Sequence, residues 1–311
     1  MRIGLIGLGW VGASTAISIL HRGIARELWL ADVREGLAKA EALDLAHGAS
    51  FYPPCSVRAA PVEEMAAHCD AIVVAAGKGA LPGSSRLDAL TVTAGIARDL
   101  GQRLRGTAAV VVVVTNPVDV VTQLIAEVSG LPAERVIGSG TVLDTSRLRH
   151  LLAQRLRIDE RSVHAYVLGE HGDSQVALWS SATVGGVPLR RLPDWARAEE
   201  SALAVSVRRA AYEIIAGKGA TNHAIGLVTA TLLQSVLRDE RRVLTVSRVH
   251  AAGSPAGSML GGGPVALSLP TIVGRGGAEQ VLLPELDEGE RRALVASADV
   301  LRAARAAVPS A

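Results

Sequence analysis

The sequence predicts an α/β fold, in which a doubly wound parallel sheet is followed by an α+β domain. From the N-terminus to about residue 140, apolar runs of strand length alternate with helical patterns, which is typical of parallel sheets covered by helices on both faces. Beyond residue 140 the strands and helices are segregated rather than alternating. A chain of 311 residues is long enough for two domains. We therefore expect one domain over residues 1–140 and a second over residues 141–311.

The elements of the first half follow from short apolar runs and from the residues that end them. Residues 2–6 form an apolar strand that runs into a glycine turn, and residues 13–22 continue as a helix that ends before Gly23. Residues 71–75 and 110–114 are nearly continuous apolar runs, as expected for strands buried on both faces. The other elements expected here are strands at 27–30 and 135–137, and helices at 34–46, 86–104 and 117–129.

The second half has a different order of elements. Residues 243–249 and 265–273 have the pattern of an antiparallel pair, joined by a glycine- and serine-rich tip at 252–263. Residues 288–307 have the spacing of a closing amphipathic helix. The other elements expected here are strands at 163–168 and 176–184, and helices at 144–156, 196–215 and 222–238.

The overall composition excludes several classes of protein. The formal net charge is only +2, and basic and acidic residues are interleaved, so electrostatic binding to nucleic acid or to a membrane surface is not expected. No apolar run has the length of a membrane span, and glycines interrupt the first apolar stretch, unlike a signal peptide. Cys55 and Cys69 form neither a C-x-x-C motif nor a disulfide framework. We expect a cytoplasmic protein that binds its ligand at a local site.

The glycine turn after the first strand is the strongest local motif. Gly7, Gly9 and Gly12 satisfy G-x-G-x-x-G, and Asp32 lies at the end of the second strand. Glycines let the backbone approach a pyrophosphate, and the helix N-terminus offers free N–H groups at the positive end of its dipole. The Asp32 carboxylate can accept from a ribose diol but would repel a ribose phosphate, for which the next residue, Val33, supplies no cation. The motif predicts a Rossmann-type domain that binds NAD, with further contact at Val11.

A histidine between two glycines is the first candidate for acid–base chemistry. His171 follows an expected strand in the stretch L-G-E-H-G-D-S at 168–174, where backbone freedom can direct a side chain into a cleft. A lone histidine is more often structural. Asp144 and Arg147, however, lie three residues apart in the first turn of an expected helix and share one face. We therefore treat these three residues as a candidate catalytic group.

Five motifs together make the chain resemble the lactate/malate dehydrogenase family over essentially its whole length. They are the glycine motif at 7–12, P-G-S-S-R-L-D at 82–88, T-N-P-V-D at 115–119, G-S-G-T-V-L-D-T-S-R at 138–147 and G-E-H-G-D-S at 169–174. Five such motifs in order are highly specific. The resemblance is closest to the bacterial NAD-dependent L-lactate dehydrogenases. It implies hydride exchange between nicotinamide and a small 2-oxo or L-2-hydroxy acid.

The resemblance also implies a role for each matched residue. His171 would donate and accept the proton, and Asp144 would orient it and favour its charged form. Arg147 would hold the substrate carboxylate through two parallel charge-assisted hydrogen bonds. Arg86, at the end of a loop that closes over the substrate, would polarise the reacting carbonyl. The other implied site residues are Asn116, which would bond near that carbonyl and contact the cofactor, and Thr221, a pocket residue on the late helix.

One substituted position bears on the choice of substrate. The family selects its substrate largely with the residue six before the loop arginine, where glutamine accompanies lactate and arginine accompanies malate. Here that position is Ala80, which would leave a second carboxylate buried without a partner. Alanine also leaves room for bulkier side chains. With Ser84 in place of the usual acidic loop residue and His223 where relatives commonly carry tryptophan, we expect turnover of pyruvate together with bulkier 2-oxo acids.

Regulation and assembly are also implied by the resemblance. Arg149 and His164 match positions at which allosteric bacterial lactate dehydrogenases bind fructose 1,6-bisphosphate across a subunit interface. Two cations suit a phosphate group, but ordinary interface or surface residues would have the same pattern. A homotetramer or homodimer is expected.

Two other functions stay open from the sequence. The first is a malate or broad-specificity L-2-hydroxycarboxylate dehydrogenase, of the hydroxyisocaproate type, on the same fold. The second is a non-catalytic dinucleotide sensor, which would keep the glycine motif and Asp32 but would not need the acid–base residues found here. A metal site is not expected, because His164 and His171 lack a third ligand at metal-binding spacing.

Overall fold

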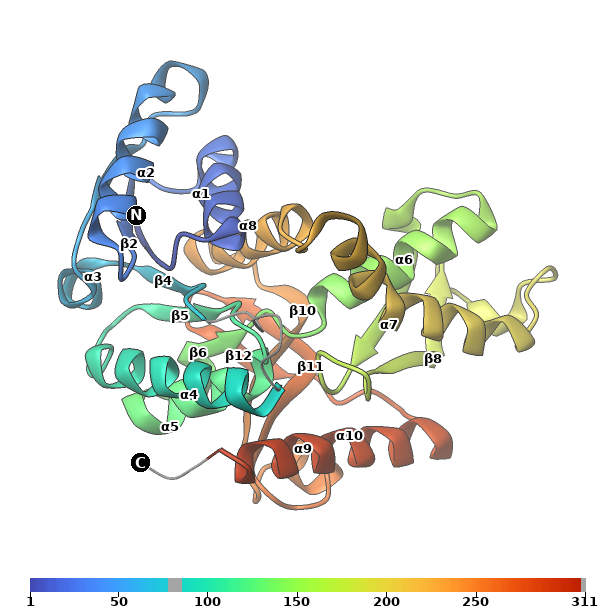
Figure 1. Cartoon of the computed structure of the whole chain (residues 1–311). Coiled ribbons are helices and arrows are strands. Elements are labelled where there is room, and N and C mark those ends of the chain that lie inside the picture. Colours follow the sequence, from blue (N-terminus) through green and yellow to red (C-terminus); the bar gives the residue numbers. More distant parts are fainter. Residues whose placement is uncertain (78–85, 309–311) are drawn as a thin grey trace.

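The computed structural model describes residues 1–77 and 86–308, without the side chains of residues 86–89. Within this part of the chain, nine strands form one sheet in the order β12-β11-β10-β6-β5-β4-β1-β2-β3 (Figure 1). The strands from β6 to β3 are parallel. The other three strands, β10, β11 and β12, continue the sheet with antiparallel pairing. The α/β class predicted from the sequence is therefore confirmed.

The N-terminal half alternates strands and helices, as predicted. β4 and β5 are buried at every residue, which explains their continuous valine- and isoleucine-rich sequences. The elements are β1 (Arg2–Ile6), α1 (Trp10–Arg22), β2 (Glu27–Ala31), α2 (Glu35–His47), β3 (Ser56–Ala59), α3 (Val62–His68), β4 (Ala71–Val74), α4 (Arg86–Arg103), β5 (Val110–Val113), α5 (Val118–Ser129) and β6 (Val136–Gly138).

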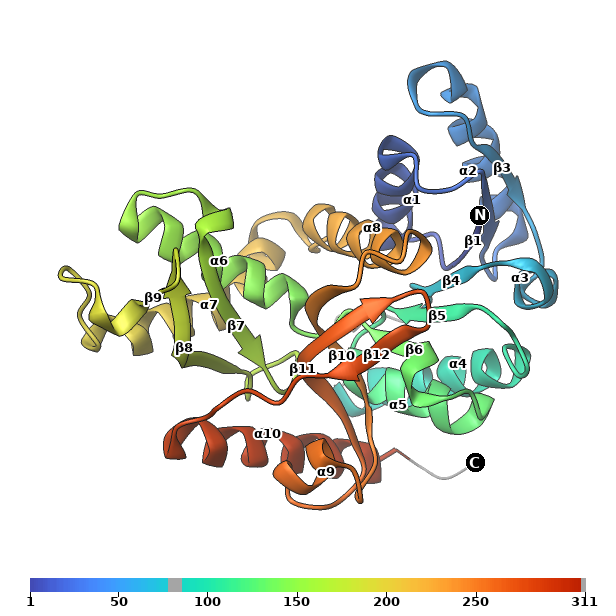
Figure 2. The ribbon, with the colours of Figure 1, turned by 180° about the vertical axis from the view of Figure 1, so that it is seen from behind.

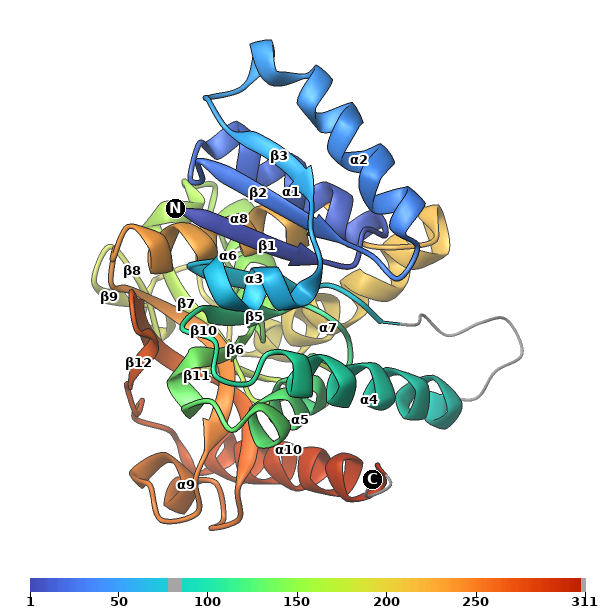
Figure 3. The same ribbon diagram turned by 90° about the vertical axis from the view of Figure 1, so that its left-hand side faces the viewer.

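Helices cover both faces of this sheet. On one face α1, α2 and α8 pack through apolar side chains such as Ile19 and Leu233. On the other face lie α3, α4 and α5 (Figure 3), which pack through side chains such as Met65 and Leu124. The two apolar layers are the reason that the central strands carry almost no polar residues.

The C-terminal half adds a smaller sheet and three strands of the large one. β7, β8 and β9 form the smaller sheet, and α6 and α7 pack beside it around Leu148, Val167 and Trp179 (Figure 2). The elements are α6 (Val142–Leu156), β7 (Val163–Leu168), β8 (Val176–Val184), β9 (Val187–Pro188), α7 (Ala198–Lys218), α8 (His223–Leu237), β10 (Arg242–His250), α9 (Pro255–Met259), β11 (Val265–Gly274), β12 (Gly277–Val281) and α10 (Glu288–Ala306).

The predicted antiparallel pair at 243–249 and 265–273 is present as β10 and β11, but the pair extends the large sheet. Nine of the ten residues of β11 are buried, so this strand needs cover on both faces, which a place inside the main sheet provides. The elements outside the predicted set are β3, α3, β9, α9 and β12. β3 is an edge strand whose residues are exposed or only half-buried, so it carries little apolar signal.

None of the helices in the described residues is long and apolar enough to cross a membrane.

Candidate active site

The carboxyl ends of the parallel strands bring the predicted site residues to one edge of the sheet. The glycine motif follows β1, Asp32 follows β2, Asn116 follows β5, and the helix that carries Asp144 follows β6. The strand order changes direction between β4 and β1, and ligands of open α/β sheets bind outside the carboxyl ends of strands at such a switch point.

The glycine motif has the close contacts that glycine alone permits. Gly7 adopts a φ of +95°, and a Cβ built there would lie 2.5 Å from the backbone nitrogen of Ala76. A Cβ on Gly12 would lie 2.0 Å from the carbonyl oxygen of Gly7. A side chain at Gly7 would collide with the chain that follows β4, and one at Gly12 would push α1 away from the end of β1.

The middle of the motif is open to a ligand. A Cβ on Gly9 would meet nothing within 4 Å, and no side chain caps the N-terminus of α1. Val11, in the first turn, is half-buried against the apolar core and so holds the helix start in place. Backbone N–H groups at the positive end of a helix suit a pyrophosphate, so these residues fit an NAD cofactor.

Asp32 is held as a carboxylate at the end of β2. Its Oδ2 accepts from the backbone N–H of Leu8 at 2.9 Å, and its Oδ1 accepts from the N–H and Nε of Arg34 at 3.0 and 3.2 Å. Burial would raise the pKa of Asp32, but these hydrogen bonds and the Arg34 charge outweigh it and lower the pKa. Val33 supplies no cation, as expected, but the neighbouring Arg34 does.

His171 and Asp144 are in direct contact. The imidazole Nδ1 of His171, in the loop between β7 and β8, lies 2.6 Å from Asp144 Oδ2 in the first turn of α6. The side chain of Asp144 is only 3% exposed, whereas that of His171 is 24% exposed. The histidine thus presents part of its ring to solvent while its partner carboxylate lies in the interior.

This contact changes the acid–base properties of both groups. Burial disfavours the charged imidazole, but the charge and hydrogen bond of Asp144, with a smaller contribution from Asp119, raise the pKa of His171 above its usual value. Burial alone would raise the pKa of Asp144, but His171 and Arg147 outweigh it and lower this pKa. The pair therefore favours an imidazolium beside a carboxylate.

Two glycines with left-handed backbone angles position this pair. Gly140, with φ of +49°, lies before α6, and Gly169, with φ of +86°, lies after β7. Ser268 of β11 bonds to both turns. Its Oγ accepts from the backbone N–H of Thr141 at 3.0 Å, and its backbone exchanges two hydrogen bonds of 3.0 Å with Gly169. Since β11 belongs to the main sheet, the sheet connects the start of α6 to the β7–β8 loop.

Arg147 also contacts Asp144. Its Nη1 donates to Asp144 Oδ1 at 2.7 Å, so each carboxylate oxygen of Asp144 bonds to a different cationic side chain. The Arg147 side chain is 14% exposed. A guanidinium has five N–H donors, and this bond uses one of them. The remaining donors give Arg147 the capacity to bind a second carboxylate.

The other predicted site residues are located as follows. Asn116 is exposed immediately after β5. Thr221 is half-buried in the turn between α7 and α8 rather than on a helix, because α8 begins only at His223. Arg86 begins α4, but its side chain lies outside the described residues. Ala80, with the whole of 78–85, lies outside them too.

The two predicted phosphate ligands lie on adjoining elements. Arg149, on α6, donates from Nε to the carbonyl oxygen of Ala165 on β7 at 3.0 Å, and its guanidinium lies 5.0 Å from the ring centre of Tyr166. Burial lowers the pKa of Arg149. His164 is exposed next to Ala165 in the same strand.

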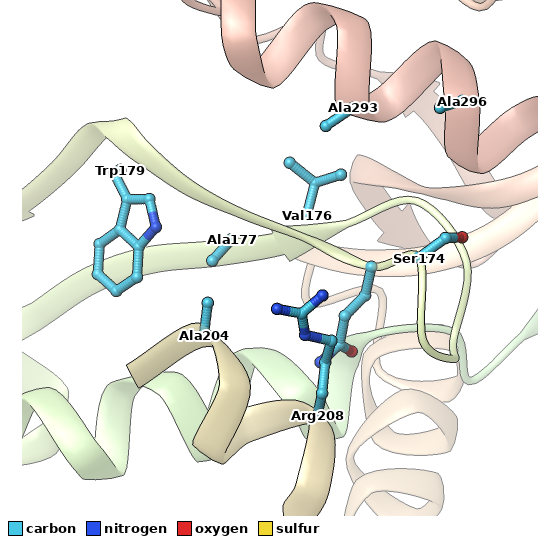
Figure 4. A pocket seen from close by; sticks show the side chains of 9 residues that line it. Ser174, Val176, Ala177, Trp179, Ala204, Arg208, Ala293 and Ala296 are labelled. Atoms are coloured by element: carbon cyan, nitrogen blue, oxygen red, sulfur yellow. The ribbon is translucent and has the colours of Figure 1, made fainter. Parts of the chain in front are cut away.

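A cavity of about 360 Å³ opens near the His171 loop, between β8, α7 and α10 (Figure 4). It is mainly apolar, and its one charged lining residue, Arg208, donates from Nη1 to the carbonyl oxygen of Asp173 at 3.3 Å. It does not include the acid–base pair. The lining residues are Ser174, Gln175, Val176, Ala177, Trp179, Ala204, Arg208, Ala293 and Ala296.

The residue to which sequence reasoning gave no role is Asp119. It belongs to the T-N-P-V-D motif, and its Oδ2 accepts from the backbone N–H of His171 at 2.8 Å. Its side chain is almost completely buried. A signal was available, because Asp119 is the one charged residue in an apolar run, between Val118 and Val120, and such a residue needs a buried partner.

A Rossmann-type cofactor edge joined to a buried carboxylate–histidine pair is the arrangement of a nicotinamide-dependent dehydrogenase. Residues 1–138 match the family model described as lactate/malate dehydrogenase, NAD binding domain, and residues 141–309 match its alpha/beta C-terminal domain. The chain therefore belongs to the lactate/malate dehydrogenase family, and its N-terminal half is an NAD-binding domain.

Individual relatives match along almost their full length. The chain is 45% identical to an L-lactate dehydrogenase of Thermus aquaticus, covering 99% of each chain. It is 43% identical to an L-lactate dehydrogenase of Synechococcus sp. (strain JA-3-3Ab), covering 97% of each. Among solved structures, the ligand-bound minor L-lactate dehydrogenase of Enterococcus mundtii superposes with a TM-score of 0.92 at 35% identity, covering 100% of this chain and 99% of that one.

The Asp32→Ala variant tests the cofactor edge. Loss of a carboxylate that accepts from a ribose diol should weaken NADH binding about ten- to a hundredfold, the range of a charge-assisted hydrogen bond. The preference for NADH over NADPH should also fall, because the repulsion of a ribose phosphate is removed. Fluorescence titration of both cofactors measures the two effects. Asp44→Ala, which removes an exposed carboxylate on α2, is the control; equal affinities in both variants would contradict the assignment.

Proposed function

We propose that this protein is an NAD-dependent L-lactate dehydrogenase, which interconverts pyruvate and L-lactate. The observation that carries the proposal is the 2.6 Å contact between His171 Nδ1 and Asp144 Oδ2, beside an arginine with donors to spare. Sequence identities of 45% and 43% to two L-lactate dehydrogenases, over almost the full length of each chain, support the same activity. A dinucleotide sensor would need the glycine motif and Asp32 but not this pair.

The contact with Asp144 determines which atom of His171 serves the reaction. Because Nδ1 bonds to the carboxylate, Nε2 is the ring nitrogen left to face a substrate. When bound, NADH would donate the hydride in reduction, and oxidised NAD would accept it in oxidation. In reduction, the imidazolium donates its Nε2 proton to the carbonyl oxygen of the 2-oxo acid. In oxidation, the neutral ring removes the proton from the hydroxyl group.

Two arginines would bind and polarise the substrate. Arg147 would hold the carboxylate of the oxo acid with the N–H donors that Asp144 does not use, which places the neighbouring carbonyl near His171. By family resemblance, Arg86 would polarise that carbonyl, with Asn116 adding a hydrogen bond and Thr221 lining the pocket.

The choice of hydroxy acid follows from Ala80, a position outside the described residues. Without a cation there, oxaloacetate would bury an unpaired carboxylate, which disfavours the malate alternative. The small side chain favours acceptance of bulkier 2-oxo acids beside pyruvate. A broad L-2-hydroxycarboxylate dehydrogenase is therefore the second candidate.

We further propose a cytoplasmic homotetramer or homodimer. Both cysteines are free, which suits a reducing compartment. The helices α1 and α8 pack together (Figure 1). Each leaves a large apolar side chain exposed, Ile17 on α1 and Leu227 on α8. Such side chains suit a subunit interface.

The His171→Asn variant tests the acid–base role. Pyruvate reduction should fall by about 10²- to 10⁴-fold, the usual contribution of a general acid, while NADH binding is retained. In the wild type, the pKa of His171 is raised, so reduction should be fastest at low pH and decline as the pH rises through this pKa, whereas lactate oxidation should increase. Steady-state rates against pH measure both. His150→Asn, at an exposed histidine on α6, should behave as wild type.

A panel of 2-oxo acids tests the substrate proposal. With NADH, we expect measurable kcat/KM for pyruvate, 2-oxoisocaproate and phenylpyruvate, and at least about a tenfold lower value for oxaloacetate, whose second carboxylate lacks a partner. Equal or better efficiency with oxaloacetate would refute the preference and favour the malate alternative. No turnover of any oxo acid would refute the enzyme assignment itself.

Fructose 1,6-bisphosphate is the proposed regulator, on the strength of Arg149 and His164. Titration of the sugar bisphosphate should lower the KM for pyruvate severalfold. The double variant Arg149→Gln, His164→Gln should abolish this effect, because each substitution removes a cationic side chain that donates hydrogen bonds to phosphate. Arg161→Gln, at an exposed arginine near the same strand, is the control. An unchanged KM in a protein whose oligomeric state is intact would remove regulation from the proposal.

A further inference from the structure

Asp119 is a buried carboxylate whose hydrogen-bond partners do not explain why a negative charge stands at this position. The residue is 2% exposed and lies on the first turn of α5. Oδ2 accepts the backbone N–H of His171 at 2.8 Å, whereas Oδ1 is buried without a hydrogen-bond partner. The nearby hydroxyl of Ser247, on β10, is likewise buried without a partner at hydrogen-bond geometry.

A single backbone N–H does not require a carboxylate. An asparagine oxygen would accept the same hydrogen bond, and a neutral amide is far less costly to bury than a charge. The negative charge is therefore the property that needs an explanation. A group able to use it is the imidazole of the residue whose N–H it binds, because the charge of Asp119 stabilises the protonated form of His171.

We propose that Asp119 is a positioning residue for His171: its carboxylate anchors the main chain of the β7–β8 loop, and its charge supplements that of Asp144. The catalytic role assigned to His171 rests on the proposed function, whereas the hydrogen bond from the His171 N–H to Asp119 does not depend on it. Asp144 orients the ring from α6, while Asp119 holds the backbone from α5. The two acids thus restrain the same residue at its side chain and at its main chain.

The charged groups around His171 set the expected pH behaviour. Asp144 and Arg147 face it from α6, Asp119 faces it from α5, and Glu170 of its own loop acts on Asp119. Burial raises the pKa of Asp119 to about 6, with the Ser247 hydroxyl and His171 opposing a further rise. Asp119 is therefore ionised at neutral pH and loses its charge as the pH falls through about 6. Its support for the imidazolium is present above that pH and is lost below it.

The test separates charge from anchoring with two variants of the full-length protein. Asp119→Asn keeps an acceptor for the His171 N–H but removes the charge, and Asp119→Ala removes both. The ¹⁵N shifts of the ring nitrogens of His171, identified by their absence in His171→Asn, are followed against pH without substrate. In Asp119→Asn the pKa of His171 should fall by about one pH unit, the lower end of the usual effect of a neighbouring opposite charge.

Kinetics supply the second readout. The pH at which pyruvate reduction is half-maximal should fall by the same amount in Asp119→Asn, because less imidazolium remains at each pH. In Asp119→Ala, kcat should fall further, by about tenfold or more for a mispositioned acid, while the KM for pyruvate changes less than about twofold. A fall in thermal stability with an unchanged His171 titration would overturn the proposal.

Matched controls keep the outcome clear. Glu290→Gln removes another buried carboxylate that accepts backbone N–H groups, those of Trp179 and Ser180, and it should cost stability without moving the His171 titration. If Asp119→Asn does not fold, Ser247→Ala serves in its place. Loss of the nearby hydroxyl raises the pKa of Asp119, so less of its carboxylate is charged between pH 6 and 7. The pKa of His171 should therefore fall. The NMR titration is independent of turnover, so a protein inactive on every oxo acid would refute the proposed function alone.

Discussion

The contact between Asp144 and His171 is the constraint on which the arrangement of the site depends. A carboxylate that is 3% exposed is stable as a charge only with close partners, and here each of its oxygens bonds to a different cation. The two residues are 27 positions apart and lie on different elements. They meet because Ser268, inside the main sheet, bonds to the turn before α6 and to the loop after β7. Displacement of either turn would separate the two residues and leave the buried Oδ2 of Asp144 without its partner.

The same sheet explains how cofactor and acid–base residues come together. Parallel strands end at a common edge, so one edge carries the glycine motif, Asp32, Asn116 and the start of α6. Glycine is required where backbone segments touch, as at Gly12, and open space remains at Gly9. The distribution of tight and open glycines is what an extended phosphate-containing ligand requires of a strand–helix turn.

Much of this organisation could be predicted from the sequence, because the signals were local. Continuous apolar runs identified β4 and β5, and the glycine motif identified the cofactor edge. Signals that depend on tertiary context were missed. β3 lies at an edge and carries little apolar pattern, and β11 looks like any buried strand, so its place in the main sheet could not be deduced. Asp119 stood in a recognised motif, but its bond to a main-chain N–H 52 residues away leaves no mark in sequence spacing. Thr221 was expected on a helix that starts later.

The two halves matched by separate family models, 1–138 and 141–309, share two apolar cores, whereas a third core, around Leu148, Val167 and Trp179, belongs to the C-terminal half alone. One apolar core combines α4 and α5 with β11 and α10, and the other combines α1 and α2 with α8. Residues from both halves therefore fill the same two cores, on opposite faces of one sheet. Neither half could bury its apolar surface if cut at residue 138 or 140. Folding of the cofactor edge and folding of the acid–base pair are therefore expected to be a single cooperative event.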